Sequence, residues 1–506
     1  MASTVEQILD SRDLYGRKIY LLGTAILGPV NTPIRANSLS HAISVFGSQG
    51  SLIDAYRVII ETRLDCEVYL CKVTGIHSEV YLNINQPFNE VIENGMYIKA
   101  KHANENYNDV SITLSEEALF IEYNPTDYNG YTLEYSYKDN PSLHGLVEAI
   151  NEDTRNLKSE VYCYANCEPN TQTIGSLDTV NPTTIKLSGG NSGLYYNKNM
   201  YYNCLDETYA MLEGFDIDLI IPLGANYDDT FTDNEEYLED YYNLDREYLT
   251  LKNDKEEYLS YYTQLLRFCK NQMRFGFLTN GIMGTFIIDD PFFDEEKYLE
   301  TLKYFNESNK QVKEYEKYKH LISVVVGDLY NMYGANISNG YIAYSAIVAS
   351  LIISENTTNR MLPKTFTIAT IFSQDSINKL QEIGFTSFRY SVLKKTVVVT
   401  NGITTSSDEA FKYFVNVRMS QLTMCYVRLL LSSFIGEDLN DILISKSLEQ
   451  GLKSLLNSLV RLKVLTGYGI NELINPITGH IFLDLSLKTI YMIENVRAYS
   501  GLASKG

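Results

Sequence analysis

The sequence predicts a multidomain protein of the α/β class (α+β mixed), with a layered α/β core, an inserted β-rich domain and a C-terminal α/β domain joined by the N-terminal arm. Three observations predict it. Residues 17–75 follow a strand, helix and strand order, as in a layered α/β unit. Residues 77–188 change to alternating apolar and polar positions, as in VSITLS and YTLEYSY, with turn signals between them. The α/β pattern resumes near Met200, so the β-rich segment is an insertion.

The predicted domain boundaries follow these changes of pattern. An N-terminal arm covers 1–18, and the C-terminal domain covers 386–506 with a terminal strand arm. The central α/β domain is formed by 19–76 and 199–385, and the inserted domain by 77–198. Within the central domain, the acidic and tyrosine-rich segment 228–320 is interpreted as an elaboration.

The first α/β unit is predicted from its local signals. A strand over Lys18 to Leu22 leads into the stretch LLGTAILGPVNTP, and a helix follows that either Ser38 or Ser40 caps. A second helix covers 51–61, because five apolar residues recur on one helical face: Leu52, Ala55, Tyr56, Ile59 and Ile60.

Later elements are predicted from apolar runs. DIDLIIPLG at 216–224 and HLISVVVGD at 320–328 are buried strands. Two long helices follow, and the leucines of the second have the spacing of a core stripe or a partner surface: Leu448, Leu452, Leu455, Leu456, Leu459 and Leu462. Gly467 and Gly469 are expected to end that helix. The final strand IFLDLSLK places Leu483, Leu485 and Leu487 on one side.

Composition limits the function. The 506 residues carry a formal charge of -21, which argues against nucleic acid as a partner. The start of the chain has no signal-peptide pattern, and the apolar stretch 341–354 is too short to span a bilayer, so no membrane insertion is expected. Seven dispersed cysteines indicate reduced thiols and assembly in a cytosol. Cys163 and Cys167 lack a second cluster that would complete a metal site, so no metal is expected.

The charge is unevenly distributed. Residues 228–262 contain 12 acidic and three basic residues, whereas 386–470 contain 10 basic and six acidic residues. These segments are either solvated helix faces or surfaces that meet a partner.

The stretch LLGTAILGPVNTP has the glycine spacing of a phosphate-binding loop in Gly23 and Gly28. Pro29 and Val30 stand where such a loop needs Lys and Ser or Thr, and no third glycine completes a dinucleotide fingerprint. The stretch is therefore interpreted as a strand end and a structural turn, in which Gly23 and Gly28 provide backbone freedom and Pro29 and Pro33 fix the exit path. A nucleotide-binding α/β enzyme is the alternative.

Other catalytic patterns are missing from the sequence. No HExxH or GxSxG motif occurs, and acidic pairs such as Glu295 and Glu296 stand at a helix start, where carboxylates complement the helix dipole. Neither catalytic residues nor a cofactor are expected, and the chain is not predicted to be an enzyme.

Several blocks, in order, resemble the sheath proteins of contractile phage tails and related injection machines. YLLGTAILGPVNTPIRANSLSHAISVFGS is similar to the family's opening block, and LSGGNSG to the return from its inserted domain. GYIAYSAIVASLI, LQEIGFTSFRYSVLKKTVVVTNGITT and VNVRMSQLTMCYVRLLLSSFIGEDLN resemble its later blocks. The chain departs from the family in lacking a Pro-Gly-Val-Tyr segment before the first strand.

The resemblance implies a structural role. It implies that the subunits stack as hexameric rings around a tail tube and contract to drive the tube through the host cell envelope for genome ejection. It implies as partners other copies of the chain, the tail tube protein, and the baseplate and tail terminator proteins. The implied location is the virion tail, after assembly in the host cytoplasm. A sheath of a headless, bacteriocin-type injection system is the alternative within this class.

The resemblance also implies site residues. The C-terminal domain would face the tube and the inserted domain would face outward. Terminal arms would add strands to neighbouring subunits, with Leu483, Leu485 and Leu487 as the candidate inter-subunit strand; alternatively, both termini complete the chain's own sheet. Five basic residues are hypothesised to face an acidic tube: Lys394, Lys395, Arg418, Arg428 and Lys446.

Overall fold

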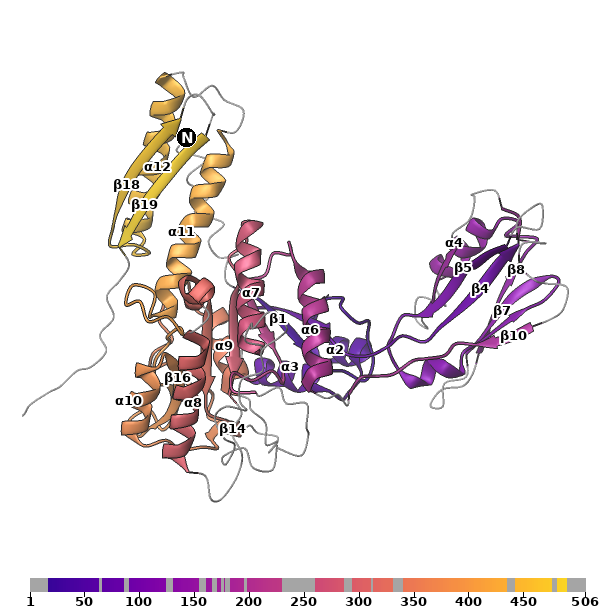
Figure 1. The fold of residues 1–506 in the computed structure, drawn as a ribbon, viewed down its shortest axis with the longest axis horizontal. Coiled ribbons are helices and arrows are strands. Elements are labelled where there is room, and N and C mark those ends of the chain that lie inside the picture. Colours follow the sequence, from indigo (N-terminus) through magenta and orange to yellow (C-terminus); the bar gives the residue numbers. More distant parts are fainter. Residues whose placement is uncertain are drawn as a thin grey trace, which may run out of the picture.

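The chain folds into three parts that follow one another across the molecule (Figure 1). A central α/β body carries a helical C-terminal part on one side and a separate β-rich domain at the end of a pair of connecting segments. The computed structural model describes residues 17–62, 66–85, 91–123, 131–153, 161–165, 171–173, 177, 183–194, 198–229, 260–285, 294–310, 313–330, 340–434, 442–475 and 480–488.

The body is built on one eight-stranded sheet, in the order β17-β16-β13-β12-β11-β1-β3-β2. Neighbouring strands are parallel, except that β2 and β17 pair antiparallel at the two edges. The inner strands are apolar runs, as expected where helices cover both faces of a parallel sheet. The strand bounds are β1 Lys18–Gly23, β2 Ile34–Arg35, β3 Glu67–Lys72, β11 Leu219–Pro222, β12 Asn280–Gly284, β13 Ile322–Val326, β16 Phe385–Ser391 and β17 Thr396–Val399.

Two hydrophobic cores lie on the two faces of this sheet. One face is covered by α2 (Leu39–Phe46), α3 (Ser51–Thr62) and α9 (Gly340–Ser350). The other is covered by α6 (Lys198–Leu212), α7 (Tyr261–Arg274), α8 (Glu295–Lys310) and α10 (Gln374–Glu382). Ten of the 11 residues of α9 are buried, because this helix lies between the sheet and α3. Shorter elements are η5 (Lys313–Leu321) and the β14 (Leu329–Tyr330) and β15 (Thr367–Ile368) pair.

The inserted domain has its own core between two antiparallel sheets and a helix. One sheet has the order β4-β5-β9 and the other β10-β6-β7-β8. The bounds are β4 Glu79–Asn85, β5 Val91–Ala100, η2 Glu105–Asp109, β6 Ser111–Leu114, β7 Ala118–Tyr123, β8 Tyr131–Ser136, α4 Leu143–Glu152, β9 Val161–Ala165 and β10 Thr183–Lys186. Figure 1 shows this domain apart from α11 and α12: the helix pair extends upward from the body, and the inserted domain lies to the right of it.

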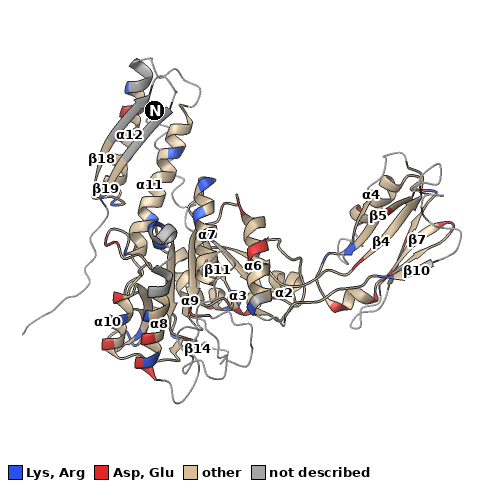
Figure 2. Ribbon diagram, viewed as in Figure 1, with Lys and Arg blue, Asp and Glu red and all other residues tan. Residues whose placement is uncertain are grey.

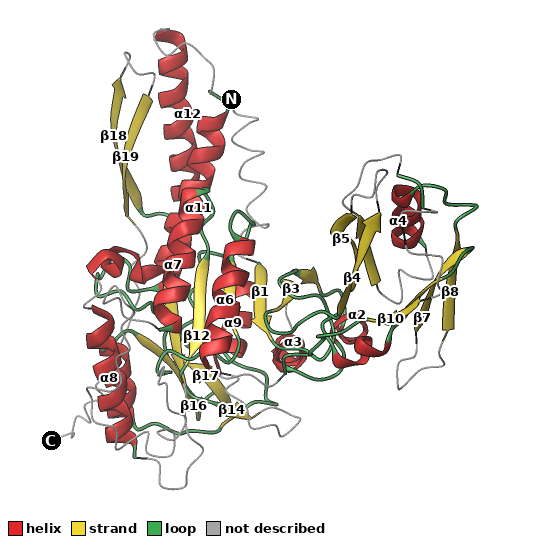
Figure 3. Ribbon diagram, turned by 45° about the vertical axis from the view of Figure 1, so that its right-hand side comes forward, coloured by secondary structure: helices red, strands yellow, loops and turns green. Residues whose placement is uncertain are grey.

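The C-terminal part is a helix pair with a hairpin lying along it (Figure 3). α11 (Phe414–Ser432) and α12 (Ile442–Arg461) share a core of leucines and other apolar residues. The hairpin strands β18 (Gly467–Asn475) and β19 (His480–Lys488) pair antiparallel. α11 begins within the body and extends away from it, so it links the two parts.

The structure corrects several sequence predictions. The segment 228–320 is not an elaboration where it is described, because it supplies β12 in the middle of the sheet and helices α7 and α8. The C-terminal boundary at 386 is wrong, because β16 and β17 extend the central sheet. Gly467 and Gly469 do not end the second long helix: it ends at Arg461, and Gly467 begins strand β18.

Two apolar residues also lie outside the cores to which the periodicity assigns them. Ile60 in α3 is 45% exposed and Leu462, just after α12, is 39% exposed. Both stand near a helix end, where the neighbouring core no longer covers the helix face.

The predicted cap of the first helix is confirmed at Ser38. The Ser38 hydroxyl accepts a hydrogen bond of 3.1 Å from the backbone N–H of His41, while Ser40 lies inside the helix. Ser38→Ala is expected to lower the free energy of unfolding by about 1 kcal/mol, because one N–H of the first turn loses its acceptor. Urea unfolding of the unassembled chain measures this, and Ser40→Ala is the control, expected to change it by less than about 0.5 kcal/mol.

Candidate assembly surfaces

The glycine stretch turns tightly where β1 leaves the sheet. Gly28 has a φ of 98°, and a Cβ at this position would overlap the ring of Phe46, whose Cε1 atom would lie 2.8 Å away. A Cβ on Gly23 would lie 2.9 Å from Leu223 Cδ1 and closer still to Ser51 Oγ. Both glycines are therefore required by close packing against α2, α3 and the strand end.

Two histidines bind the backbone N–H groups of this turn. The N–H of Gly28 donates to His102 Nδ1 at 3.0 Å, and the N–H of Val30 donates to His77 Nε2 at 3.3 Å. His77 Nδ1 lies 2.7 Å from the carbonyl oxygen of Ala100, which fixes its proton on Nδ1. The donors that would hold a phosphate in a nucleotide-binding loop are thus already occupied by imidazole rings.

These histidines stand in the segments that cross from the body to the inserted domain. Other contacts tie the same segments together: Ala103 N–H donates to Gly28 O at 3.2 Å, and the Thr74 hydroxyl donates to Gly193 O at 2.6 Å. The Asn104 side chain donates to Ile26 O at 2.8 Å. The glycine stretch therefore fixes the base of the inserted domain, and we call these contacts the insertion junction.

Burial at the insertion junction favours the neutral forms of His77, His102 and Lys72. Burial lowers the pKa of His102 to about 4, and it also lowers the pKa of His77. Lys72 is fully buried and donates to Ala103 O at 2.7 Å; burial lowers its pKa to about 7, although the carboxylate of Glu105 acts in the opposite direction. A neutral imidazole is required at His102, because Nδ1 accepts a hydrogen bond there.

His77, His102 and Lys72 are not predicted from the sequence. The six histidines of the chain form no catalytic or metal-binding motif, so nothing in their spacing singles out these two. One signal was available: His77 stands at the predicted start of the inserted domain, where side chains must satisfy the backbone of the crossing segments.

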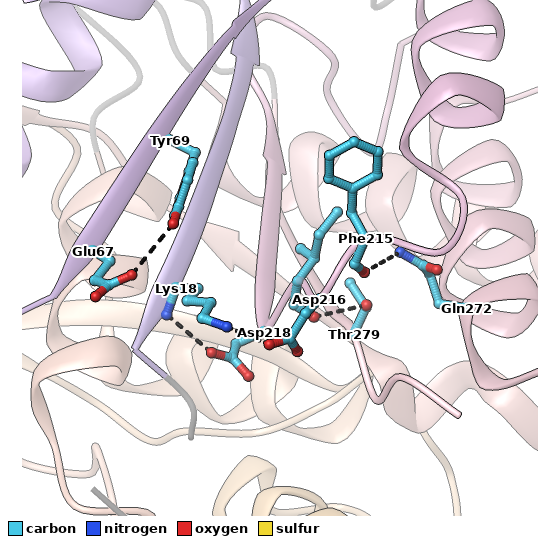
Figure 4. A network of polar contacts seen from close by, with 9 residues as sticks. Lys18, Glu67, Tyr69, Phe215, Asp216, Asp218, Gln272 and Thr279 are labelled. Atoms are coloured by element: carbon cyan, nitrogen blue, oxygen red, sulfur yellow. Dashed lines mark hydrogen bonds and ion pairs between the residues drawn. The ribbon is translucent and has the colours of Figure 1, made fainter. Parts of the chain in front are cut away.

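A network of polar contacts lies at the amino ends of the parallel strands, where the chain enters β1 (Figure 4). The backbone N–H of Lys18 donates to Asp218 at 3.0 Å, and its ammonium group pairs with Asp216. On the same edge, Thr279 donates to Ile217 O at 2.8 Å and Gln272 to Phe215 O at 3.1 Å. The start of β1 is therefore anchored at the strand ends from which α11 also departs.

The C-terminal hairpin has its apolar side against the helices. Leu485 and Leu487 are partly buried against the core of α11 and α12, while Ser486 and Lys488 are exposed. Leu483 is opposite Glu472 in the hairpin register, and its side chain lies outside the described part of the structure. Within the described residues this sheet has two strands, so each strand has one edge without a strand neighbour. Residues 1–16 of the predicted N-terminal arm 1–18 are outside the described residues, as are residues 489–506 after β19, whereas the predicted terminal strand is β19 itself.

The five candidate basic residues do not share one surface. Arg418 is 5% exposed and donates to Val348 O at 2.8 Å, so its prediction as a surface residue is wrong. Burial lowers the pKa of Arg418 to about 10. Arg428 is exposed on α11 but donates to Gly276 O at 2.6 Å, whereas Lys446 is exposed near the start of α12.

Lys394 and Lys395 are not part of the helix pair, and the Lys394 ammonium group donates to Asn359 O at 2.7 Å. They form part of the turn between β16 and β17, at the carboxyl ends of the parallel strands. α11 contacts the sheet at the amino ends of the parallel strands, where the Gln421 side chain forms hydrogen bonds with the Asn280 side chain at the start of β12. Figure 2 shows blue Lys and Arg positions both along α11 and on the body. The basic surplus of 386–470 is thus divided between two ends of the body.

Neither a metal-binding group of side chains nor a membrane-spanning helix is found among the described residues. No group of three or more His, Cys, Asp or Glu side chains there is close enough to hold a metal ion. The six described cysteines are free thiols, and Cys163 is buried while Cys167 lies outside the described residues. None of the helices in the described ranges is long and apolar enough to cross a membrane.

Comparison with known proteins finds similarity in structure. No protein-family model matches the sequence, and no curated protein matches it either. The structure is similar to the crystal structure of the sheath tail protein Lin1278 from Listeria innocua, with a TM-score of 0.56 and 11% identity over 96% of both chains. It is also similar to a chain of the anti-feeding prophage baseplate in its contracted state, with a TM-score of 0.51 and 10% identity.

That second match covers 97% of this chain and 94% of the other. Both matches therefore include the body, the inserted domain and the C-terminal part together, as the order of the sequence blocks predicts. The chain has the fold of the contractile tail sheath proteins.

Proposed function

We propose that the chain is the structural subunit of a contractile sheath, which polymerises around a tube and contracts to drive it through a host envelope. One observation carries this proposal: the fold similarity to a sheath tail protein extends over 96% of both chains. The same proposal includes assembly in the host cytoplasm as hexameric rings around a tail tube. Baseplate and tail terminator proteins are further proposed partners. The proposed location is the tail of a phage virion. The alternative is that the chain forms the sheath of a headless injection system.

The C-terminal hairpin supports assembly by strand addition. A two-stranded sheet whose outer edges have no strand neighbour in the described part of the chain presents backbone N–H and C=O groups to an incoming strand. An arm of a neighbouring copy would satisfy these groups by β-augmentation. Such links persist while the contacts between bodies change, and this is what contraction requires of a connected lattice.

The layout of the parts supports a radial arrangement. In the proposed sheath the helix pair α11 and α12 faces the tube, and the inserted domain, which extends from the body in a different direction in Figure 1, faces outward. In that orientation Lys446 lies on the tube side, whereas Lys394 and Lys395 lie on the far edge of the body.

Lys446→Glu is expected to weaken binding of assembled subunits to an acidic tube by a few fold, because a rim charge that attracts the tube becomes one that repels it. The effect should shrink at high salt, where such charges are screened. Co-sedimentation of tubes with sheath measures it. Lys394→Glu is the matched control, and equal weakening by both variants would contradict the proposed orientation.

Negative-stain microscopy tests the proposal against the enzyme alternative. Purified full-length chain is expected to form tubes or stacked rings, and removal of residues 1–16 is expected to prevent this without unfolding the body. The nucleotide alternative predicts saturable ATP or NAD binding that Gly28→Ala abolishes. A chain that binds a nucleotide and stays monomeric at high concentration would overturn the sheath proposal.

A further inference from the structure

A polar pocket of about 120 Å³ lies where five segments of the body meet. Its walls are the turn at 356–359, one side of α10, Arg389 of β16, the segment after β17, and residues 412–413 just before α11. The last two walls belong to the connector that joins the central sheet to the C-terminal helices. A ligand in this pocket would therefore contact the body and the connector at once.

The walls carry cationic and neutral polar side chains but no acidic ones. Of the 13 residues that line the pocket, six have amide side chains, two are threonines, and Arg389 and Lys412 are cationic; no acidic residue is among these described wall residues. Two nearby carboxylates already pair with other cations: Glu355 with Arg360 at 2.9 Å, and Asp375 with Lys379 at 2.8 Å. In a chain of formal charge -21, a pocket with two cations and no acid is unusual.

The asparagine side chains of the wall provide hydrogen-bond donors, because their amide oxygens are already bonded to neighbouring groups. Asn359 Oδ1 accepts from the Arg389 guanidinium at 2.7 Å, and Asn356 Oδ1 accepts from the backbone N–H of Thr358 at 3.2 Å. Both partners are obligate donors, so they fix which amide atom is the oxygen. The Thr400 hydroxyl lies 3.0 Å from Asn401 Oδ1 and 2.9 Å from Ser387 O, and its single proton can serve one of these two acceptors.

The same pattern recurs on α10, where Asn378 Oδ1 accepts from Gln374 Nε2 at 3.2 Å. Asn356 and Asn359 thus have their oxygens engaged by obligate donors of the wall, which leaves their NH2 groups as donors. Asn401 and Thr400 are 8% and 7% exposed, so this part of the wall is almost fully buried.

We propose that this pocket binds a small oxyanion, either a phosphate or a carboxylate group. Such a group has only acceptors when ionised, and it needs several donors and a cation, which Arg389, Lys412 and the asparagine amides provide. The volume admits one such group and no nucleotide. The source is either a free anion or an acidic side chain of a neighbouring copy. The inference does not depend on the proposed sheath, because binding is measured on the unassembled chain.

The test is a titration of the unassembled full-length chain with inorganic phosphate. Binding is measured by calorimetry and by the shift in melting temperature. Saturable binding is expected for the wild type. Lys412→Gln removes one cation and is expected to weaken phosphate binding roughly tenfold or more, because hydrogen bonds to charged groups are the strong ones. Lys364→Gln, an exposed lysine outside the pocket, is the matched control and is expected to bind as the wild type.

Asn359→Asp is a second variant that keeps the shape of the wall. Asn359 is exposed and has a φ of 58°, a conformation that aspartate also tolerates, so the variant is expected to fold. Its carboxylate would pair with Arg389 and repel phosphate, so binding is expected to be lost. Retention of phosphate affinity by both Lys412→Gln and Asn359→Asp, or the lack of saturable binding by the wild type up to about 50 mM phosphate, would overturn the proposal.

Assembled and unassembled chain are compared to identify the source of the oxyanion. If a neighbouring copy supplies a carboxylate, phosphate binding is lost on assembly and Lys412→Gln weakens the polymer. If a free anion is the ligand, assembled chain still binds phosphate with the affinity of the unassembled chain. Either result supports the pocket as an oxyanion site, and failure to polymerise would count against the sheath proposal alone.

Discussion

Gly28→Ala is expected to lower the free energy of unfolding by about 3 kcal/mol. Two costs contribute: a side chain at a φ of 98° is strained, and the new methyl group overlaps the Phe46 ring. Phe46 is 1% exposed in the core of the body and cannot move aside without disturbing it. Urea unfolding of the unassembled chain measures the loss.

Gly214→Ala is the matched control for this prediction. Gly214 also has a positive φ, of 85°, but a Cβ there would meet no atom within 4 Å. This variant is expected to lose only the backbone contribution, about 1 kcal/mol. Equal losses in the two variants would contradict the claim that the glycine stretch is packed against α2 as a structural turn.

Acidification from pH 7 to pH 4 is expected to destabilise the insertion junction, with a contribution of about 3 kcal/mol from His102. The folded chain keeps His102 neutral down to a pKa of about 4, whereas the unfolded chain binds the proton near the usual pKa of 6.5. Between these values the unfolded state holds more protons, so stability falls as the pH falls through this window. His77, whose pKa is also lowered, acts in the same direction.

Comparison of the wild type with His102→Asn isolates this contribution. The Asn side chain can still offer an acceptor to the Gly28 N–H, but it does not titrate. The difference between the unfolding free energies at pH 7 and pH 4 is expected to be about 3 kcal/mol smaller in the variant. The same pH dependence in both chains would show that His102 is not held neutral by the junction.

The layered core could be predicted because its strands and helices carry their own patterns. LIIP and ISVVV are apolar runs that only a sheet covered on both faces buries, and α3 shows one apolar face. Ser38 caps α2 with its own hydroxyl, a local contact that sequence reasoning captures.

What could not be predicted depends on contacts between distant residues. β12, with the sequence NGIMG, is a short central strand because β11 and β13 lie on either side of it. Gly467 begins β18 because β19 pairs with it, although a glycine after a helix usually indicates a helix end. The backbone hydrogen bonds of neighbouring strands outweigh the local signal in both cases.

The candidate site shows the same division. The absence of Lys and Ser or Thr after Gly28 was enough to argue against a phosphate-binding loop. The two histidines that accept from its N–H groups could not be predicted, because His77 lies 47 residues from Val30 and His102 lies 74 residues from Gly28. Arg418 was also predicted wrongly. Its charge predicted a position on the surface, but it is buried and donates to the carbonyl oxygen of Val348, 70 residues earlier in the sequence.

Cryo-electron microscopy of the polymer formed by purified chain tests the sheath proposal most directly. The predicted result is a hollow helical tube in which α11, α12 and the hairpin line the inner surface and the inserted domain forms the outer one. Neighbouring copies are expected to add strands to the edges of the β18 and β19 sheet. A polymer with the inserted domain on the inside, or a chain that remains monomeric at high concentration, would contradict the account.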